Sequence, residues 1–182
     1  MKATGIVRRI DELGRIVIPK EIRRTLRIRE SDPLEIFTDN EGSIILKKYS
    51  PIGEMGALAE QYADSLSQAV GALVCVTDTD RIIAASGNGK KDFLEKSITK
   101  ELRQALSERI QIKANFGERK FIKITESQNE EYESEVIDPI ICEGDIIGSV
   151  CILKKAGKGQ AGEMEQKLAL CASIFLGRQM EQ

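Results

Sequence analysis

The sequence has 182 residues, of which 41% are hydrophobic and 31% charged, and its formal net charge is -2. It contains no apolar run near the roughly 18 to 20 residues that cross a bilayer, and its first residues lack the apolar core of a signal peptide. We therefore expect a cytoplasmic protein with no membrane partner.

The residue types also limit the chemistry. Histidine is absent, which removes the commonest general base and the usual partner of a nucleophilic serine or cysteine. The cysteines, Cys75, Cys142, Cys151 and Cys171, show no Cys-x-x-Cys spacing, so we expect no metal site, no cofactor and no catalytic residues. Cys75 and Cys151 lie in apolar strand patterns, typical of buried thiols. Cys142 is the best candidate for a redox-sensitive thiol, although the neighbouring acids disfavour its thiolate.

The two ends of the chain differ in charge. Residues 1–50 contain eleven Lys or Arg and eight Asp or Glu, a net charge of +3. The remaining residues contain 16 basic and 21 acidic residues, a net charge of -5. Opposite charges on two parts of one chain indicate two separate functions.

The first fifty residues predict a β-β-α-β-β unit. β-branched runs bound the turn at residues 11–14, and Pro19 can open a helix. The predicted elements are strands 5–10 and 15–18, helix 19–26, and strands 34–38 and 43–47, the last two flanking a turn at 39–42. Because so small a unit buries too little surface to be stable alone, we expect an obligate dimer.

Basic residues gather around the join between the second strand and the helix. In a helical projection, Ile22 and Leu26 share one side and the basic residues share the other. The basic residues are Lys20, Arg23, Arg24 and Arg27 on the helix and Arg8, Arg9 and Arg15 on the strands before it. A solvated helix face is the alternative interpretation. The planar arginine fork suits phosphates and guanine edges, and only Phe37 and Tyr49 could stack RNA bases, so we expect double-stranded DNA as the partner.

These residues carry a resemblance to a known family. "MKATGIVRRIDELGRIVIPKEIRRTLRI" and "ILKKYSP" strongly resemble the AbrB-type swapped-hairpin DNA-binding domain of bacterial transition-state regulators. The resemblance implies an intertwined dimer whose exchanged hairpins form one barrel-like core. It also implies DNA contacts by Arg8, Arg15, Arg23 and Arg24, helped by Arg9, whereas Lys2, Lys20 and Arg27 are weaker candidates that rest on the charge pattern alone.

The chain departs from the family pattern at one turn. The family usually has Gly-Asp after the helix, and this chain has Ser31 before Asp32. If the turn requires a positive φ angle, serine strains it by on the order of 1 kcal/mol. We expect DNA binding to survive this strain.

Beyond a linker around Pro51, the sequence predicts a second domain that begins and ends with amphipathic helices, at 54–70 and 163–180. Their apolar stripes are Met55, Leu58, Ala59, Tyr62, Leu66 and Val70, and Met164, Leu168, Cys171, Ala172 and Phe175. Between them lie predicted strands 73–78, 81–86, 120–125, 134–142 and 146–154 and a helix over 97–109. Pairing of the two terminal helices across copies would couple the domains and make a homotetramer.

"VCVTDTDRIIAASG" and "PIICEGDIIGSVCIL" resemble the strands of GAF domains. This resemblance implies either a pocket for a small molecule or a platform for assembly, and the ligand is unknown. Ser86, Asn88 and Lys90 could face such a pocket or form an exposed turn.

Together these features predict an α+β protein. Its parts are an AbrB-like swapped-hairpin DNA-binding domain at 1–50, a linker at 51–55 and a GAF-like sensor or oligomerisation domain at 56–182. The whole chain is similar to sporulation regulators with this domain order, which implies a transcription regulator that both activates and represses genes. The alternatives are a cysteine-dependent enzyme or a purely structural assembly module in the GAF-like half, and an antitoxin-like partner protein.

Overall fold

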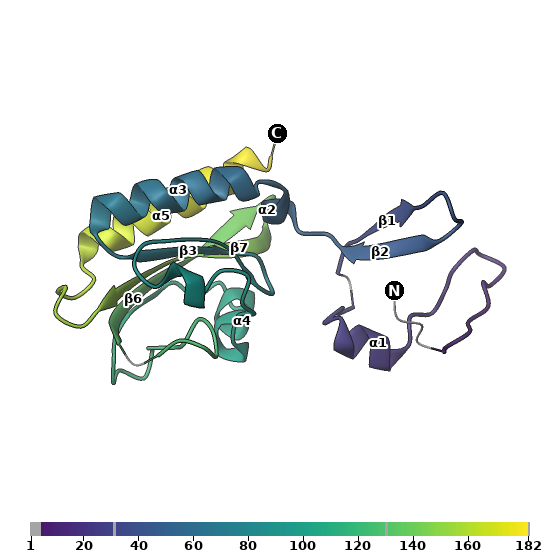
Figure 1. Cartoon of the computed structure of the whole chain (residues 1–182), viewed down its shortest axis with the longest axis horizontal. Helices are drawn as coiled ribbons and strands as arrows, with labels where there is room; N and C mark the ends of the chain where they lie inside the picture. Colours follow the sequence, from purple (N-terminus) through teal and green to yellow (C-terminus); the bar gives the residue numbers. More distant parts are fainter. Residues whose placement is uncertain (1–4, 31, 130, 182) are drawn as a thin grey trace. The chain divides into compact units, whose positions relative to one another are not determined.

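The computed structural model describes residues 5–30, 32–129 and 131–181, and it divides into two compact units, Met1–Tyr49 and Ser50–Gln182 (Figure 1). Two residues named above, Lys2 and Ser31, lie outside the described residues. Across the described ranges, no helix combines the length and the apolar character that a membrane span requires.

The first unit contains a short helix and a β-hairpin. Its elements are α1 (Lys20–Thr25), β1 (Leu34–Thr38) and β2 (Ile44–Lys48). β1 and β2 pair antiparallel, with Leu34 opposite Lys48 and Thr38 opposite Ile44. Asp39 closes their turn because its carboxylate accepts hydrogen bonds from the backbone amides of Glu41 and Ser43.

The predicted strands 5–10 and 15–18 are not strands in the single chain. Their turn is formed, because the Gly14 amide donates to the Asp11 carbonyl at 3.0 Å and the Asp11 amide donates to the Arg15 carbonyl at 3.0 Å. No ladder follows, and the segment runs as an open loop beside the hairpin (Figure 1). A strand requires a neighbour for its backbone groups, and among the described residues these segments form no ladder with each other or with the hairpin.

Helix α1 is shorter than the predicted 19–26 and ends in a left-handed residue. Pro19 precedes the helix, and its carbonyl accepts from the Arg23 amide at 2.9 Å. At the other end Arg27 has a φ of 56°, and the Ile28 amide donates to the Arg23 carbonyl at 2.8 Å. This is the Schellman arrangement, in which glycine usually occupies the left-handed position.

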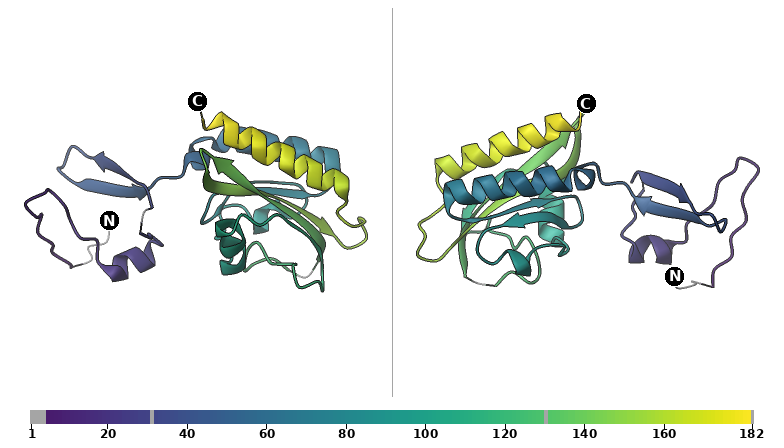
Figure 2. Two further views of the ribbon diagram at one scale, coloured as in Figure 1. Left: turned by 180° about the vertical axis from the view of Figure 1, so that it is seen from behind. Right: turned by 45° about the horizontal axis from the view of Figure 1, so that its top comes forward.

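The second unit is a five-stranded antiparallel sheet with helices on both faces. Its elements are α2 (Pro51–Glu54), α3 (Gly56–Val70), β3 (Leu73–Thr77), β4 (Ile82–Ser86), η1 (Lys90–Asp92), α4 (Lys100–Ser107), β5 (Ile112–Asn115), β6 (Tyr132–Cys142), β7 (Asp145–Lys155) and α5 (Glu163–Gln179). The strand order is β4-β3-β7-β6-β5. Helices α3 and α5 lie side by side on one face, and α4 lies on the other (Figure 2).

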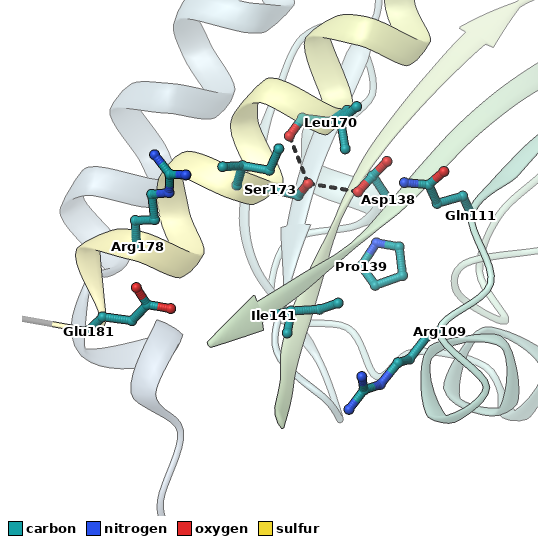
Figure 3. Close-up of a pocket in the computed structure, with 10 residues that line it drawn as sticks. Arg109, Gln111, Asp138, Pro139, Ile141, Leu170, Ser173, Arg178 and Glu181 are labelled. Carbon is teal, nitrogen blue, oxygen red and sulfur yellow. Dashed lines mark hydrogen bonds between the residues drawn. The ribbon is translucent and has the colours of Figure 1, made fainter. Parts of the chain in front are cut away.

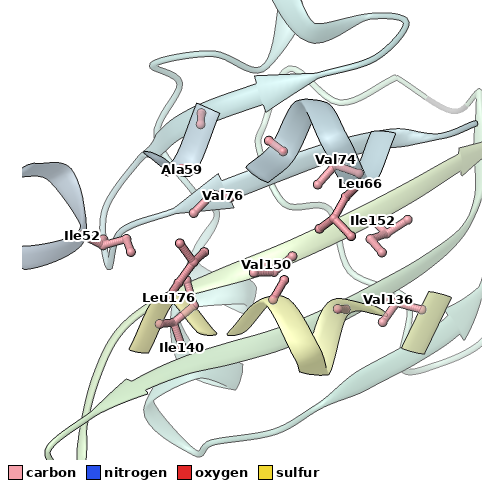
Figure 4. Packing of buried hydrophobic residues seen from close by; sticks show 14 of the residues in the cluster. Ile52, Ala59, Leu66, Val74, Val76, Val136, Ile140, Val150, Ile152 and Leu176 are labelled. Carbon is pink, nitrogen blue, oxygen red and sulfur yellow. The ribbon is translucent and has the colours of Figure 1, made fainter. Parts of the chain in front are cut away.

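Each face of the sheet has its own hydrophobic core. Under α3 and α5, the buried residues include Leu66, Val150 and Leu176 (Figure 4). On the opposite face, Leu102 of α4 and Phe93 pack in a second cluster. Every residue of the interior strand β3 is buried, as expected when both faces of a sheet are covered.

The segment predicted as a linker at 51–55 is part of the second unit. Pro51–Glu54 forms helix α2, with Ser50 as its N-cap and Pro51 at the first helical position. Ile52 has no exposed surface and packs in the core under α3 and α5. Pro51 therefore starts a helix where the sequence suggested only an interruption.

Two further differences concern the sheet. The predicted strand 120–125 makes only an isolated bridge between Thr125 and Ile98. Side chains satisfy its backbone instead, because Glu135 accepts from the Ile122 amide at 2.9 Å and Gln128 accepts from the Ile124 amide at 2.8 Å. The edge strand β5 was not predicted, since its four residues give too short an alternation to distinguish.

The apolar stripe predicted for the last helix is rotated from the buried face. The buried residues of α5 are Glu165, Ala169, Ala172, Ser173, Leu176 and Gly177. Met164 is instead 57% exposed, and Cys171 is also exposed. Four of these six buried residues are small, and part of the apolar surface of α5 faces solvent.

Candidate nucleic-acid interface

The first unit lacks a hydrophobic core of its own. Among its described residues only Pro19 is buried. Val7, Leu13 and Val17 are 89%, 74% and 73% exposed. An apolar groove of about 350 Å³ is lined by Ile6, Arg8, Ile16, Val17, Ile18, Pro19, Ile22, Leu26, Ile28 and Leu46. So much exposed apolar surface on a small unit indicates a missing partner.

Most of the predicted DNA-contacting residues are accessible. Arg8, Arg9, Arg15, Arg24, Lys20 and Arg27 are exposed, and Arg23 is half-buried. Arg23, Arg24 and Lys20 lie on α1, whereas Arg8, Arg9 and Arg15 lie on the open loop before it. The structure thus leaves these cations free to meet a polyanion, with the exceptions of Arg15 and Arg23 described next.

Arg15 forms an ion pair with Asp11. Its Nε lies 2.7 Å from Asp11 Oδ2, and Asp11 Oδ1 accepts from the amides of Leu13 and Arg15. The backbone and side-chain hydrogen bonds from Arg15 lower the pKa of Asp11. The side chain of Arg15 is still 71% exposed, so a phosphate can compete with Asp11 for it. This pairing was not predicted from the sequence.

Arg23 differs from the other arginines in its burial. Its Nε is buried, and no described residue accepts a hydrogen bond from it. A buried donor without a partner costs about 1 to 3 kcal/mol.

In the second unit, two of the three predicted pocket residues line a cavity. Ser86 and Asn88 border a space of about 380 Å³ beside the end of α3. Ser86 donates to Asp64 at 2.9 Å, and Asp64 also accepts from Gln68 at 2.7 Å. Lys90 is exposed at the start of η1. Three polar side chains at this cavity, those of Ser86, Asp64 and Gln68, are thus already paired with one another.

The cysteines are all reduced in this structure. Cys75 and Cys151 are buried, and burial raises the pKa of both thiols, that of Cys151 to about 12. Burial, Glu143 and Glu181 raise the pKa of Cys142. A thiol with a raised pKa is a poor nucleophile at neutral pH. The described residues hold no cluster of histidine, cysteine or acidic side chains that could bind a metal ion.

Comparison with known proteins identifies the family. The family described as "Stage V sporulation protein T C-terminal, transcription factor" matches residues 54–181. Over the full length of both proteins, the chain is 50% identical to stage V sporulation protein T of Bacillus subtilis (strain 168). The chain belongs to the stage V sporulation protein T family. The predicted function, a transcription regulator of sporulation, is confirmed by this membership.

The first domain of this family member is AbrB-like, as predicted. Residues 7–54 match the family described as "Antidote-toxin recognition MazE, bacterial antitoxin". Over 74 residues the chain is 57% identical to the transition state regulatory protein AbrB of B. subtilis (strain 168). This match covers 41% of this chain and 76% of that protein. The match over the whole chain to stage V sporulation protein T disfavours an antitoxin.

The second domain has the predicted GAF-like fold. It resembles the GAF domain of an Acinetobacter phosphoenolpyruvate-protein phosphotransferase, with a TM-score of 0.55, 11% identity, and coverage of 69% of this chain and 81% of that one. It also resembles a type II free methionine-R-sulfoxide reductase from Thermoplasma acidophilum, with a TM-score of 0.53, 12% identity, and coverage of 71% and 94%. At such identities the likeness concerns the fold alone.

Proposed function

We propose that this regulator contacts duplex DNA through Arg8, Arg9, Arg15, Arg23 and Arg24 of a dimeric first domain, residues 1–50. It acts in the cytoplasm and activates some promoters while it represses others. The observation that carries the proposal is the coincidence, in one small unit, of exposed arginines with an apolar surface that has no cover. Lys2, Lys20 and Arg27 contribute less.

The apolar groove of the first unit supports a dimer. The two segments at 5–10 and 15–18 have strand-type sequences but no ladder within one chain. A second copy that contributes the same segments would supply both the missing backbone partners and the cover for Val7 and Val17. We call the proposed DNA contact formed by Arg8, Arg9, Arg15, Arg23 and Arg24 the arginine edge. Dimerisation doubles this edge, which raises the number of phosphates that one protein neutralises.

The arginine edge is tested by binding of the full-length protein to a promoter fragment. Arg24→Gln and Arg8→Gln each remove one exposed cation per copy, and we expect each to weaken binding roughly ten-fold or more while the dimer remains intact. Lys47→Gln is the matched control, because Lys47 carries the same charge in the same unit but lies over the Phe37 ring, at 4.6 Å. Equal losses of affinity for all three variants would contradict the proposal, because binding would then depend only on net charge.

We further propose that helices 54–70 and 163–180 pair between dimers to form a tetramer. Met164 is 57% exposed and Cys171 is also exposed on α5, and α3 lies alongside (Figure 2). An exposed apolar helix face next to a second helix suits a four-helix bundle. Met164→Glu should reduce the molar mass seen by light scattering from tetramer to dimer, and Lys167→Ala on the same helix should not.

The second domain regulates or assembles and does not catalyse. Membership in a transcription-factor family supports this assignment, as do the raised pKa values of Cys75, Cys142 and Cys151. Incubation of the full chain with free methionine-R-sulfoxide and dithiothreitol should yield no methionine above the rate without protein. Methionine production by the wild type that disappears in the Cys142→Ser variant would overturn the assignment.

A further inference from the structure

A cavity of about 380 Å³ lies between the C-terminal half of α5 and the open edge of β6 (Figure 3). It differs from the cavity at Ser86 and belongs wholly to the second unit. Asp138 and Pro139 of β6 and Ser173 of α5 border it, and Arg109 comes from the turn after α4. Ile141, Leu170 and Ile174 supply apolar walls.

The strand pairing explains why a cavity forms there. β5 begins at Ile112, which pairs with Ile137, so β6 beyond Ile137 has β7 as its neighbour but not β5. Pro139 has no amide hydrogen to offer on this free edge. The sheet is therefore open beside α5, and Arg109 and the residues after it border the gap without filling it.

Asp138 is the charged group at this cavity that most needs a partner. It is only 3% exposed, yet it lines the space, and burial raises its pKa. Ser173 Oγ lies 2.7 Å from Asp138 Oδ1 and 2.9 Å from the Leu170 carbonyl, so a neutral hydroxyl is its hydrogen-bond donor (Figure 3). No described cation lies within ion-pair distance of it. A cationic group that entered the cavity would provide the missing charge.

Arg109 supplies the opposite charge on another wall. It occupies the left-handed position after α4, with a φ of 56°, where glycine is usual. Its guanidinium donates to the Gly144 carbonyl, which fixes the head group at the cavity. An arginine has five N–H donors, so others remain for an anion. The backbone strain at this residue is tolerated while the side chain is held in place.

We propose that this cavity binds a small zwitterion with an apolar body, either a free amino acid or a short peptide with free termini. The ammonium group pairs with Asp138, the carboxylate meets Arg109, and the apolar part packs on Ile141, Leu170 and Ile174. The cavity volume accommodates either ligand. The inference adds a ligand class to the second domain and does not depend on the proposed DNA contacts.

The test is calorimetry on the full-length protein with four probes. L-leucine and L-alanyl-L-leucine carry both charges, whereas isopentylamine and 4-methylpentanoate each carry one. We expect a zwitterion to bind roughly ten-fold or more tightly than either half molecule, and the better of the two zwitterions gives the ligand length. Equal binding of zwitterion and half molecules, or no binding by any probe, would overturn the proposal.

Variants locate the site. Asp138→Asn keeps an acceptor for Ser173 but removes the charge, and Arg109→Gln removes the cation, so each should weaken zwitterion binding roughly ten-fold. Ile174→Trp fills the cavity from an exposed position and should abolish binding. This variant keeps the test informative if Asp138→Asn fails to fold. Arg119→Gln, an exposed site that does not line the cavity, should leave the affinity unchanged. Unchanged affinity in Ile174→Trp, or an equal loss of affinity in Arg119→Gln, would refute the assignment.

Discussion

Ser50 Oγ donates a hydrogen bond to Asp78 Oδ2 at 3.1 Å, and the same oxygen accepts from the Gly53 amide at 3.2 Å. One side chain therefore caps α2 and ties it to the turn after β3. Asp78 is 6% exposed, and its other oxygen accepts from the amides of Asp80 and Arg81. The first residue after the DNA-binding unit is thus fixed to the core of the second.

Removal of this cap should destabilise the second unit. Ser50→Ala loses both hydrogen bonds, and we expect a loss of about 1 to 2 kcal/mol in the free energy of unfolding, the range for an N-cap. Guanidinium denaturation followed by far-UV circular dichroism measures it. Ser65→Ala is the control, since Ser65 is exposed and donates only to the Gln61 carbonyl of its own helix; an equal loss there would show that Ser50 has no special role.

The buried Glu135 makes the stability of the second unit depend on pH. Glu135 has no exposed surface, no described group donates to its Oε2, and burial raises its pKa to about 8. The unfolded chain releases this proton near pH 4.5, whereas the folded chain keeps it until about pH 8. The contribution of Glu135 to the free energy of unfolding is therefore greatest below pH 4.5. It falls as the pH rises toward 8, by about 1.4 kcal/mol per pH unit at most.

Glu135→Gln tests this dependence, because glutamine still accepts from the Ile122 amide but cannot ionise. The variant should lose stability less steeply than the wild type between pH 5.5 and 8, as measured by thermal melts at several pH values. Glu133→Gln changes an exposed neighbour on the same strand and should retain the wild-type slope. Parallel slopes for wild type and Glu135→Gln would show that Glu135 ionises normally.

Arg27 strains the end of α1. Its left-handed backbone favours glycine, so Arg27→Gly should raise the free energy of unfolding by about 1 kcal/mol. Arg24→Gly lies inside the helix and should lower it by about 1 kcal/mol. The two melting temperatures should therefore move in opposite directions. A decrease for Arg27→Gly would mean that the arginine side chain makes a stabilising contact that outweighs the strain.

Asp11 competes with DNA for Arg15. Asp11→Asn removes the ion pair but keeps an oxygen for the turn, so it should strengthen DNA binding by about 1.5- to five-fold, as expected for one surface ion pair. Glu12→Gln removes the same charge from the adjacent exposed residue. Fluorescence anisotropy should show the larger gain for Asp11→Asn; equal gains would mean that only net charge matters.

The sequence predicted the elements whose patterns are long and locally determined. The strand sequence around Val150 and the amphipathic pattern that includes Leu66 were correctly assigned, because the strand is buried on both faces and the helix on one face within the same chain. The strands predicted at 5–10 and 15–18 do not form in the single chain, because strand-type sequence alone does not supply a neighbour for the backbone. The cavity at Asp138 could not be predicted, because it depends on where β5 begins.

Side-chain pairing explains the remaining differences. Residues 120–125 have strand-type composition, but Glu135 and Gln128, which follow later in the chain, satisfy their backbone donors. The basic residues of α1 were found from composition and spacing, whereas the pairing of Arg15 with Asp11 and the burial of Arg23 required the three-dimensional structure. Local patterns therefore located the candidate interface but not its internal contacts.

The salt dependence of DNA binding tests the central claim most directly. The affinity of the full-length protein for a promoter fragment should fall steeply and linearly on a plot of log K against log salt concentration, with a slope near −0.9 times the number of phosphates contacted. Arg24→Gln should make the slope shallower by about 1 per copy, and Lys47→Gln should not change it. A wild-type slope near zero, or a slope unaffected by Arg24→Gln, would contradict the assignment of the arginine edge as the DNA contact.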